Sequence, residues 1–523
     1  MKRKALVIGA STIAIAAVGT GVLVAPLAAD PQGEKDCGGG ALPLLEPEVA
    51  ASAQAPEPRW QQKGGSVNDA SCVDRTAIAG IVAPRTEAEV AEALAYAKAT
   101  KLTISPAGVR HSMGGQAFRR GGIMLDMRRM NRIELHPESS TVTVGAGATW
   151  HDIQKSIHPR FAVKAMQSTD IFTVGGSISV NAHGMDHHAG AVMDSIRSLR
   201  VMRADGQVVT ASHDQNPELF NLVVGGYGLF GVILSAELEV VPNDIYQSER
   251  EVVATKDLPE RLEKILADPS IGLMYVHLST APGSLLGEAL IYSYHRIDDP
   301  HAERAPLSDI ASVKMRRLTV NLAKKSSAFQ SFKWWSEKHL EHRFEACTVT
   351  RAQAMKDGEA CLVSRNDPMH DSVPYLKNAM KNDTDILHEY FVPRSELGPF
   401  IAGLRDVIRK QDANLLNASI RVVGKEHNAL SYAPEPAYSI VLYLNQRTDA
   451  DGNAKMARLT SDLIDLTLAH HGRFFLPYQL YYSPEQLERS YPEIRGFFAA
   501  KRKWDPDGLF RNTWYDRYAP AFG

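Results

Sequence analysis

The chain has 523 residues, of which 44% are hydrophobic and 23% charged, and 58 basic against 60 acidic residues give a formal net charge of -2. These values exclude a disordered chain, a collagen and a membrane protein with many spans. They also argue against a nucleic-acid partner, because nucleic-acid-binding proteins carry a broad basic surface. At this length we expect two or three domains.

The N-terminal segment 1–29 predicts a membrane anchor or a signal peptide. Lys2–Lys4 is basic, and the 25 residues Ala5–Ala29 after it are uncharged, which is long enough for a helix that crosses a bilayer. Basic residues before such a run hold that end in the cytoplasm, so we expect the rest of the chain on the other side. A cleaved signal peptide is the alternative. Segment 30–69, rich in Pro, Gly, Ala and Glu, is expected to be a tether.

The four cysteines lack the spacing of a zinc site. In an oxidising compartment we expect two disulfides, Cys37 with Cys72 and Cys347 with Cys361. Four buried thiols without any bridge are the alternative.

From residue 77 the chain alternates strand and helix patterns. Ile78–Val82 is a β-rich run, and Thr86–Ala97 combines a Thr-x-x-Glu capping box with helical apolar spacing. Leu102–Pro106 predicts a second strand, which ends in the glycine-rich loop Ala107–Ala117. Glycine permits positive φ and close approach to a ligand, and exposed N–H groups in such a turn bind phosphate oxygens. The loop therefore predicts a diphosphate site.

Two further glycine clusters follow the first. Strand patterns at Gly122–Asp126 and Thr141–Gly147 lead to Thr149, which is expected to open a helix. A Gly-Gly turn is predicted within Met166–Gly184, and a third cluster, Val224–Ile233, leads into another strand. Small residues at such turns let a flat ring lie against the backbone.

Four different motifs follow one another along the chain, namely Arg110–Gln116, Thr173–Ser177, His183–Gly184 and Gly225–Ile233. In sequence and order they resemble the FAD-binding domain of the vanillyl-alcohol-oxidase superfamily, also called the PCMH type. Within it the sugar and polyol oxidases are the most similar, namely alditol oxidase and gulonolactone oxidase, with decaprenylphosphoryl-ribose oxidase more distant.

The resemblance implies an α+β fold with two domains. A PCMH-type FAD-binding domain would cover 70–243, a substrate or cap domain with an antiparallel sheet 244–480, and a C-terminal segment, 481–523, would return to the FAD domain. Three later segments resemble cap strands and the final helix and turn of alditol oxidase, namely Leu387–Arg394, Asn417–Val423 and Lys501–Asn512.

The resemblance also implies FAD as cofactor, bound covalently through His111, which stands where alditol and gulonolactone oxidases carry the histidine bonded to the flavin. A histidine that only hydrogen-bonds the cofactor is the alternative. The Gly175–Ser177 turn is expected at the ribityl chain and isoalloxazine, and Val232 and Ile233 at the adenosine end. The expected cofactor-binding residues are Gly108, Arg110, His111, Ser112, Met113, Gly114, Gly115, Gln116, Gly175, Gly176, Ser177, His183, Gly184, Val232, Ile233 and Asn512.

Three histidines stand around Gly184, namely His183, His187 and His188. They lack the carboxylate and histidine spacing of a known metal site. We therefore expect His183 at the flavin edge, the other two in solvent, and no metal.

Oxidation at a C–H bond beside a hydroxyl requires a partner for the hydroxyl proton and a positive group near flavin N1 and O2. By the resemblance, Arg421 matches the active-site arginine of alditol oxidase. Two residues earlier that enzyme has a catalytic glutamate where this chain has Ser419, and its lysine corresponds to Tyr478. The candidate catalytic residues are Arg421, Tyr478, Glu389, Tyr390 and Asp170.

These residues predict an FAD-dependent oxidoreductase that oxidises a CH–OH group of a sugar, polyol, sugar acid or lactone. Electrons would pass to oxygen, a quinone or a redox protein. Amine oxidation like that of cytokinin dehydrogenase is the alternative, since Asp170 matches an aspartate that assists amine deprotonation in that family. A flavin-binding protein without turnover is a further alternative.

Segment 312–343 is basic, with eight Lys or Arg against two Glu, and contains Trp334 and Trp335. We expect a solvated cap face, with binding to anionic lipid as the alternative.

Overall fold

The computed structural model describes residues 55–298, 303–309, 312–340, 349–350, 362–374, 376 and 382–523. Ala5–Ala29 and three cysteines, Cys37, Cys347 and Cys361, lie outside these ranges. Cys72 is disulfide-bonded, and because the other cysteines are not described, both pairings stay predictions. Across the described ranges, every helix is too short or too polar to cross a bilayer.

The N-terminal part of the fold, residues 60–242, contains two larger sheets and a two-stranded one. Of the two larger sheets, the smaller has four strands in the order β1 (Trp60–Lys63), β4 (Gly80–Val82), β6 (Ile123–Asp126) and β5 (Ile104–Ala107). Helix α3 (Glu87–Ala99) begins where the capping box predicts, since Thr86 Oγ1 accepts a hydrogen bond from Glu89 N at 3.2 Å.

The expected tether ends earlier than predicted. β1 pairs with β4, and β2 (Ser66–Val67) pairs with β3 (Thr76–Ala77), so residues from Trp60 onward are part of the folded body. Their polar composition misled the sequence interpretation, because β1 is an edge strand with three exposed residues.

The second N-terminal sheet has six strands and is antiparallel. Its order is β11 (Val208–Ala211), β10 (Ile196–Met202), β12 (Val232–Pro242), β8 (Thr141–Gly145) and β7 (Ile133–His136), with β9 (Phe161–Val163) joined to β12. The helices of this part are α4 (Trp150–Ile157), α5 (Val174–Ser179) and α6 (Pro217–Val223).

The prediction of a turn at Gly175–Ser177 is wrong, because these residues lie in helix α5. Glycine is required there for close packing rather than for chain reversal. A Cβ on Gly175 would lie 2.9 Å from Ala146 Cβ, so the short helix rests directly on the end of β8.

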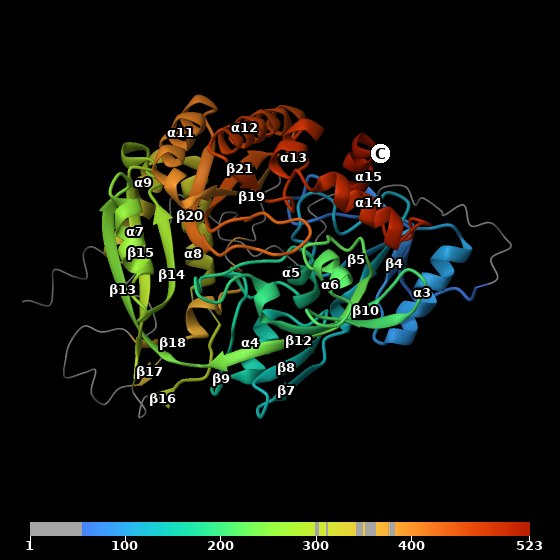
Figure 1. The fold of residues 1–523 in the computed structure, drawn as a ribbon. Coiled ribbons are helices and arrows are strands. Elements are labelled where there is room, and N and C mark those ends of the chain that lie inside the picture. The colour runs from blue at the N-terminus through green and yellow to red at the C-terminus, as the bar shows by residue number, and fades with distance from the viewer. Residues whose placement is uncertain are drawn as a thin grey trace, which may run out of the picture.

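The second half of the chain builds one antiparallel sheet of eight strands. Its order is β18 (Leu362–Ser364), β13 (Ile245–Ala254), β15 (Glu288–Ile297), β14 (Ile271–Leu278), β20 (Asn414–Val423), β21 (Ala437–Arg447), β19 (Asp383–Pro393) and β22 (Arg473–Phe474). Helices α11 (Leu397–Lys410) and α12 (Ala450–Ala469) pack on the outer face, with α7 (Leu258–Leu266) beside α11 (Figure 1).

The basic segment 312–343 forms helices α8 (Val313–Lys325) and α9 (Ser327–His339) as far as it is described. The expectation of a solvated face is only partly correct. Lys324 and Trp334 are buried and bonded to Asp385 and Glu288, whereas four apolar side chains are exposed, namely Met315, Phe329, Phe332 and Trp335.

The last helices, α13 (Pro484–Ser490), α14 (Ile494–Trp504) and α15 (Thr513–Tyr518), return to the N-terminal part (Figure 1). Ile104 N donates to Leu509 O at 2.7 Å, and Arg511 N donates to Ile104 O at 3.1 Å, which extends the β5 edge. Residues near both ends of the described chain therefore share one sheet.

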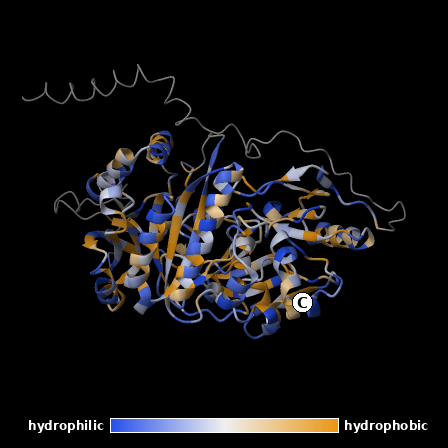
Figure 2. Ribbon diagram, turned by 90° about the horizontal axis from the view of Figure 1, so that it is seen from above, coloured by the Kyte–Doolittle hydropathy of each residue, from blue (hydrophilic) through white to orange (hydrophobic). Residues whose placement is uncertain are grey.

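Two packed α+β parts with a large antiparallel sheet confirm the predicted fold class. Along the strands, apolar and hydrophilic residues stand side by side (Figure 2), as expected of sheets with one face in a core. The largest buried cluster runs through both parts and places side chains of β8, β12, β14 and β19 in a common core.

Candidate active site

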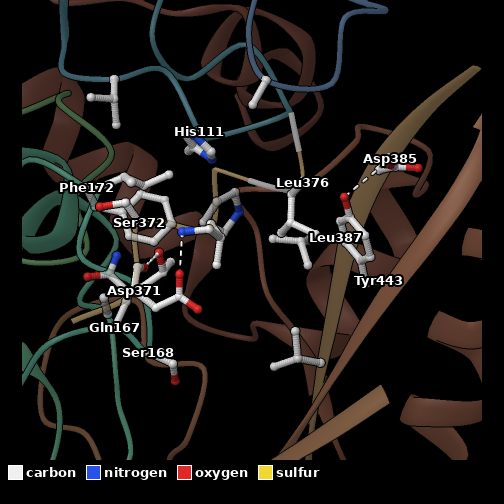
Figure 3. A pocket seen from close by; sticks show the side chains of 18 of the residues that line it. His111, Gln167, Ser168, Phe172, Asp371, Ser372, Leu376, Asp385, Leu387 and Tyr443 are labelled. Carbon is white, nitrogen blue, oxygen red and sulfur yellow. Dashed lines mark hydrogen bonds between the residues drawn. The ribbon is translucent and has the colours of Figure 1, made fainter. Parts of the chain in front are cut away.

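A cavity of about 2170 Å³ lies between the N-terminal part and the eight-stranded sheet. Loop 106–113, segment 167–185 and residues 227–233 line one side, and alternate residues of β14, β19, β20 and β21 line the other. In Figure 3, His111, Phe172 and Gln167 lie on one side, with Leu387 and Tyr443 opposite. This volume accommodates a dinucleotide-sized cofactor together with a substrate.

The predicted diphosphate loop opens onto this cavity. Its end is fixed, because Met113 N donates to Pro477 O at 2.6 Å and Gln116 Nε2 donates to Leu476 O at 2.8 Å. Its start is open, since no described residue accepts a hydrogen bond from the backbone N–H of Val109, Arg110 or Ser112. Arg110 has a φ of 58°, and such an alternation of backbone handedness turns successive N–H groups toward one anion.

His111 lines the cavity beside this loop, and its ring meets the Phe172 ring edge-to-face, with 5.0 Å between centroids. Gly176 also lines the cavity, and a Cβ there would meet only Thr173 Oγ1, at 3.2 Å. Gly108 is different, because its Cβ would stand 1.9 Å from the same oxygen. Gly176 therefore leaves room for a ligand, whereas Gly108 is required by the protein itself.

Most of the predicted cofactor residues line the cavity, but five of them do not: Gly114, Gly115, Gly184, Val232 and Asn512. Gly115 packs on Thr513, and a Cβ on Gly184 would lie 2.0 Å from Met166 O. Asn512 caps α15 and donates through Nδ2 to Tyr227 O at 2.9 Å. These residues support the loops that face the cavity.

Arg421 lies on the cavity face of β20, together with Asn417 and Ser419, because side chains alternate along a strand. Its Nε donates to Ser168 Oγ at 3.0 Å, and its guanidinium lies 4.9 Å from the centre of the Tyr275 ring. No carboxylate among the described residues pairs with it. Burial lowers the pKa of Arg421, but a guanidinium stays charged in proteins, so a positive group faces the cavity.

Glu389 on β19 accepts hydrogen bonds from three side chains. His183 Nε2 and Ser439 Oγ donate to Oε1, both at 2.5 Å, and Tyr478 OH donates to Oε2 at 3.2 Å. Burial alone would raise the pKa of Glu389. The nearby His183 and the three hydrogen bonds lower this pKa by more than burial raises it, so the net shift is downward. Burial, followed by the Glu389 charge, raises the pKa of Tyr478 well above its usual value. Tyr478 is therefore a proton donor to an ionised Glu389.

The other two catalytic candidates do not face the cavity. Tyr390 lies on the opposite side of β19, where its hydroxyl bonds to His388 Nδ1 at 3.0 Å and its ring packs near Phe400. Asp170 is fully buried, and its carboxylate accepts from His151 Nδ1 at 2.8 Å and from Ser372 Oγ at 2.7 Å.

The histidines around Gly184 separate in the structure. His183 lines the cavity and pairs with Glu389, and His188 is exposed as predicted. The prediction of a solvated His187 is wrong, because both of its ring nitrogens are buried without a hydrogen-bond partner. Burial, followed by the charge of His188, lowers the pKa of His187 to about 4.

Sequence reasoning missed several cavity residues on the sheet and on α8. Tyr443 OH donates to Asp385 Oδ2 at 3.0 Å (Figure 3), and Lys324 pairs with the same carboxylate. The alternation of side chains along β19 and β21 predicts which residues share a face. Only the register between the two strands shows that Tyr443 and Asp385 meet.

The comparisons with known proteins agree with this geometry. Residues 78–212 match the model of an FAD-binding domain, and residues 236–518 match the model of the D-arabinono-1,4-lactone oxidase family. The chain belongs to this family. It is an FAD-dependent oxidoreductase, and its predicted membership of the PCMH-type superfamily is confirmed.

Individual relatives differ in how much of the chain they match. An uncharacterized oxidoreductase, ORF5 in the fasciation locus of Rhodococcoides fascians, is 37% identical over 163 residues, 31% of this chain and 37% of the relative. Decaprenylphosphoryl-beta-D-ribose oxidase of Mycolicibacterium smegmatis is 25% identical over 423 residues, 77% of this chain and 86% of the relative. Cytokinin dehydrogenase 2 of Arabidopsis thaliana is 32% identical over 164 residues, 30% of this chain and 32% of the relative.

Proposed function

We propose that this flavoenzyme oxidises a CH–OH group of a sugar, polyol, sugar acid or lactone. One observation carries the proposal: the charged guanidinium of Arg421 and the Glu389–Tyr478 pair line the same cavity as the His111 loop. The match to the lactone oxidase family over 236–518 and to the mycobacterial ribose oxidase supports the same reaction class.

The residues around the cavity fit an FAD molecule. The open N–H groups of Val109, Arg110 and Ser112 would hold its diphosphate, and Gly176 leaves space for the ring system. His111 would hold the isoalloxazine covalently, as the resemblance implies. When bound, FAD supplies the hydride acceptor.

Arg421 would hold the substrate hydroxyl and stabilise negative charge at the flavin. Its Nε and Nη1 donate to Ser168 Oγ and Ile420 O, while Nη2 has no acceptor among the described residues. Nη2 is therefore available to a ligand, and its direction is fixed by the contact with Tyr275.

The proton of the substrate hydroxyl would leave through Tyr478. As the phenol oxygen takes this proton, its own proton passes to Glu389 Oε2, 3.2 Å away, so charge is conserved along the pair. Three hydrogen bonds orient the Glu389 carboxylate before the reaction. Its lowered pKa keeps it ionised and ready to accept at neutral pH.

Amine oxidation through Asp170 has less support. The carboxylate of Asp170 is occupied by His151, His370 and Ser372 and is absent from the cavity wall. The cytokinin dehydrogenase match also covers only 30% of this chain.

A substrate panel tests the proposed function. The enzyme is mixed under nitrogen with polyols, sugar acids, lactones and amines, and bleaching of the flavin is followed. We expect bleaching by a CH–OH donor. Bleaching by amines alone would replace this proposal with amine oxidation, and no bleaching by any class would favour a flavin-binding protein without turnover. Reoxidation by air, a quinone or a redox protein then identifies the electron acceptor.

Acid precipitation tests the covalent bond. We expect the flavin to stay with the precipitated wild-type protein and to be released from His111→Ala, which still contains the open N–H groups. Complete release of flavin from the wild type would leave a non-covalent cofactor at the same site.

We also propose that the folded part lies outside the cytoplasm, either exported or membrane-anchored. The basic Lys2–Lys4 before Ala5–Ala29 supports this orientation, and the disulfide of Cys72 suits an oxidising compartment. A C-terminal reporter that is active only after export tests it. An inactive reporter on a chain that is nevertheless expressed contradicts the orientation.

A further inference from the structure

Two histidines and an aspartate from three distant segments meet beside the cavity. His151 lies on α4, Asp309 follows β16 (Glu303–Arg304), and His370 follows the short helix η5 (Asp367–Met369). One possible ligand atom of each of the three residues lies within 4.8 Å of the other two. No spacing in the sequence signals this cluster, because 158 and 61 residues separate its members.

Asp170 holds both imidazoles through Nδ1, and Gln154 Oε1, 3.0 Å from His370 Nδ1, helps to orient the second ring. Asp170 Oδ2 lies 2.8 Å from His151 Nδ1 and 3.1 Å from His370 Nδ1. The two rings are stacked, with 4.6 Å between centroids. A carboxylate that accepts from Nδ1 leaves the lone pair on Nε2, and this arrangement is typical of histidines that bind metals.

The Nε2 atom of His370 is the second indication. The side chain is 2% exposed, and Nε2 has no hydrogen-bond partner. Buried polar atoms normally have a partner, because an unpaired one costs free energy. This nitrogen points to Asp309 Oδ1, which lies 3.8 Å away, too far for a hydrogen bond.

We propose that His151, His370 and Asp309 bind one divalent transition-metal ion such as Zn²⁺. Asp309 Oδ1 lies 3.6 Å from His151 Nε2 and 3.8 Å from His370 Nε2. Ligands about 2.0–2.1 Å from a tetrahedral Zn²⁺ stand about 3.4 Å apart, so an inward shift, together with a turn of the stacked rings that directs both Nε2 lone pairs to one point, would complete the site. Asp309 is mostly exposed, and the same Oδ1 also pairs with Lys155 Nζ at 3.0 Å, so a bound metal would compete with this exposed ion pair.

Bound metal would join the two parts of the molecule. His151 belongs to the N-terminal part, while Asp309 and His370 come from the later part and line the cavity. The ion would therefore stabilise one wall of the cavity, and it would not bind any of the proposed reacting groups, Arg421, Tyr478 and Glu389. Three protein ligands leave the fourth position of a tetrahedral ion to water.

Calorimetric titration of the chelator-treated holoenzyme with ZnCl2, without an affinity tag, tests the site. We expect one Zn²⁺ per chain. Asp309→Asn should abolish saturable binding or weaken it by more than the positioning variant Asp170→Asn, which should weaken it about 10–100-fold. Asp309 is exposed, so its substitution leaves the core intact.

His213→Ala is the matched control, because His213 is an exposed histidine of the same part and outside the cluster. It should bind Zn²⁺ like the wild type, and His370→Ala should not. Absence of saturable binding by the wild type overturns the proposal. Binding that Asp309→Asn and His370→Ala leave unchanged also overturns it, since the metal would then lie elsewhere.

Discussion

The two sides of the cavity are built in different ways. On the N-terminal side, the residues come from short continuous motifs, such as loop 107–117 and segment 167–185. On the sheet side, they come one or two at a time from β14, β19, β20 and β21. Holding a cofactor needs backbone groups that follow each other along the chain, whereas positioning a substrate needs side chains that the strand register brings together.

The carboxylate on the sheet side illustrates the difference. The resemblance placed a glutamate at position 419, where this chain has serine. Ser419 and Glu389 both pair with Val441, so they stand level with each other on strands two apart. Strand spacing makes this separation about 10 Å. The carboxylate thus comes from another strand of the same sheet, and we expect it to select a different substrate.

Arg421 gives the largest expected effect, because its positively charged guanidinium faces the cavity from β20. Arg421→Ala should slow flavin reduction about 100–1,000-fold, the usual cost of losing a preorganised donor, while FAD content stays normal. Rapid-mixing kinetics under nitrogen measure the rate. Arg296→Ala, an exposed arginine on β15 of the same sheet, is the control and should leave the rate unchanged.

An unchanged rate in Arg421→Ala would make this residue a brace between Ser168 and the Tyr275 ring. The sheet side would then contribute only the Glu389–Tyr478 pair to the reaction, and the assignment of Arg421 to substrate binding would fail.

Tyr478 sharpens the comparison further. Tyr478→Phe removes only the hydroxyl that bonds to Glu389, so we expect flavin reduction to slow by about 100-fold, as for the loss of acid–base catalysis. Tyr443→Phe, which removes a hydroxyl bonded to Asp385 on the same face, is the comparison variant and should have a smaller effect. If both variants lost the same amount of flavin-reduction rate, the proton route could not be assigned to Tyr478 alone.

The sequence predicted the N-terminal side better than the sheet side. The capping box at Thr86, the loop before Met113 and the open turn at Arg110 depend on neighbours in the chain. Glu389, Tyr478 and Ser439 meet only because β19 pairs with β21 and the chain returns after α12. Tyr390 was misassigned for the same reason, since one residue along a strand reverses the face.

Glu426 joins the two sides and makes stability depend on pH. Asn181 Nδ2 of the N-terminal side donates to its Oε1 at 2.5 Å, and Tyr432 N donates to its Oε2 at 2.6 Å. Burial nevertheless raises the pKa of Glu426 from 4.5 to about 7. The folded state therefore binds the proton more tightly, and this stability is fully present below about pH 4.5 and lost as the pH rises to about 7.

A pKa shift of this size corresponds to roughly 3 kcal/mol of unfolding free energy. Denaturant unfolding between pH 4.5 and 8 should show this loss in the wild type, and Glu426→Gln should show none of it. The same pH dependence in both proteins would mean that Glu426 is ionised in the folded state.

Gly184 gives the smallest expected effect and tests the N-terminal side alone. A Cβ on this residue would lie 2.0 Å from Met166 O. Met166 O is a backbone atom, so the main chain itself would have to shift to relieve the overlap. Gly184→Ala should therefore cost about 1–3 kcal/mol of stability by overpacking, seen as a lower Tm. Gly424→Ala, where a Cβ would meet nothing within 4 Å, should change stability by less than about 0.5 kcal/mol.

Because Gly184 lies off the cavity wall, the folded Gly184→Ala variant should reduce its flavin at the wild-type rate, in contrast to Arg421→Ala. A rate that falls together with Tm would show that this motif positions reacting groups as well as supporting the fold.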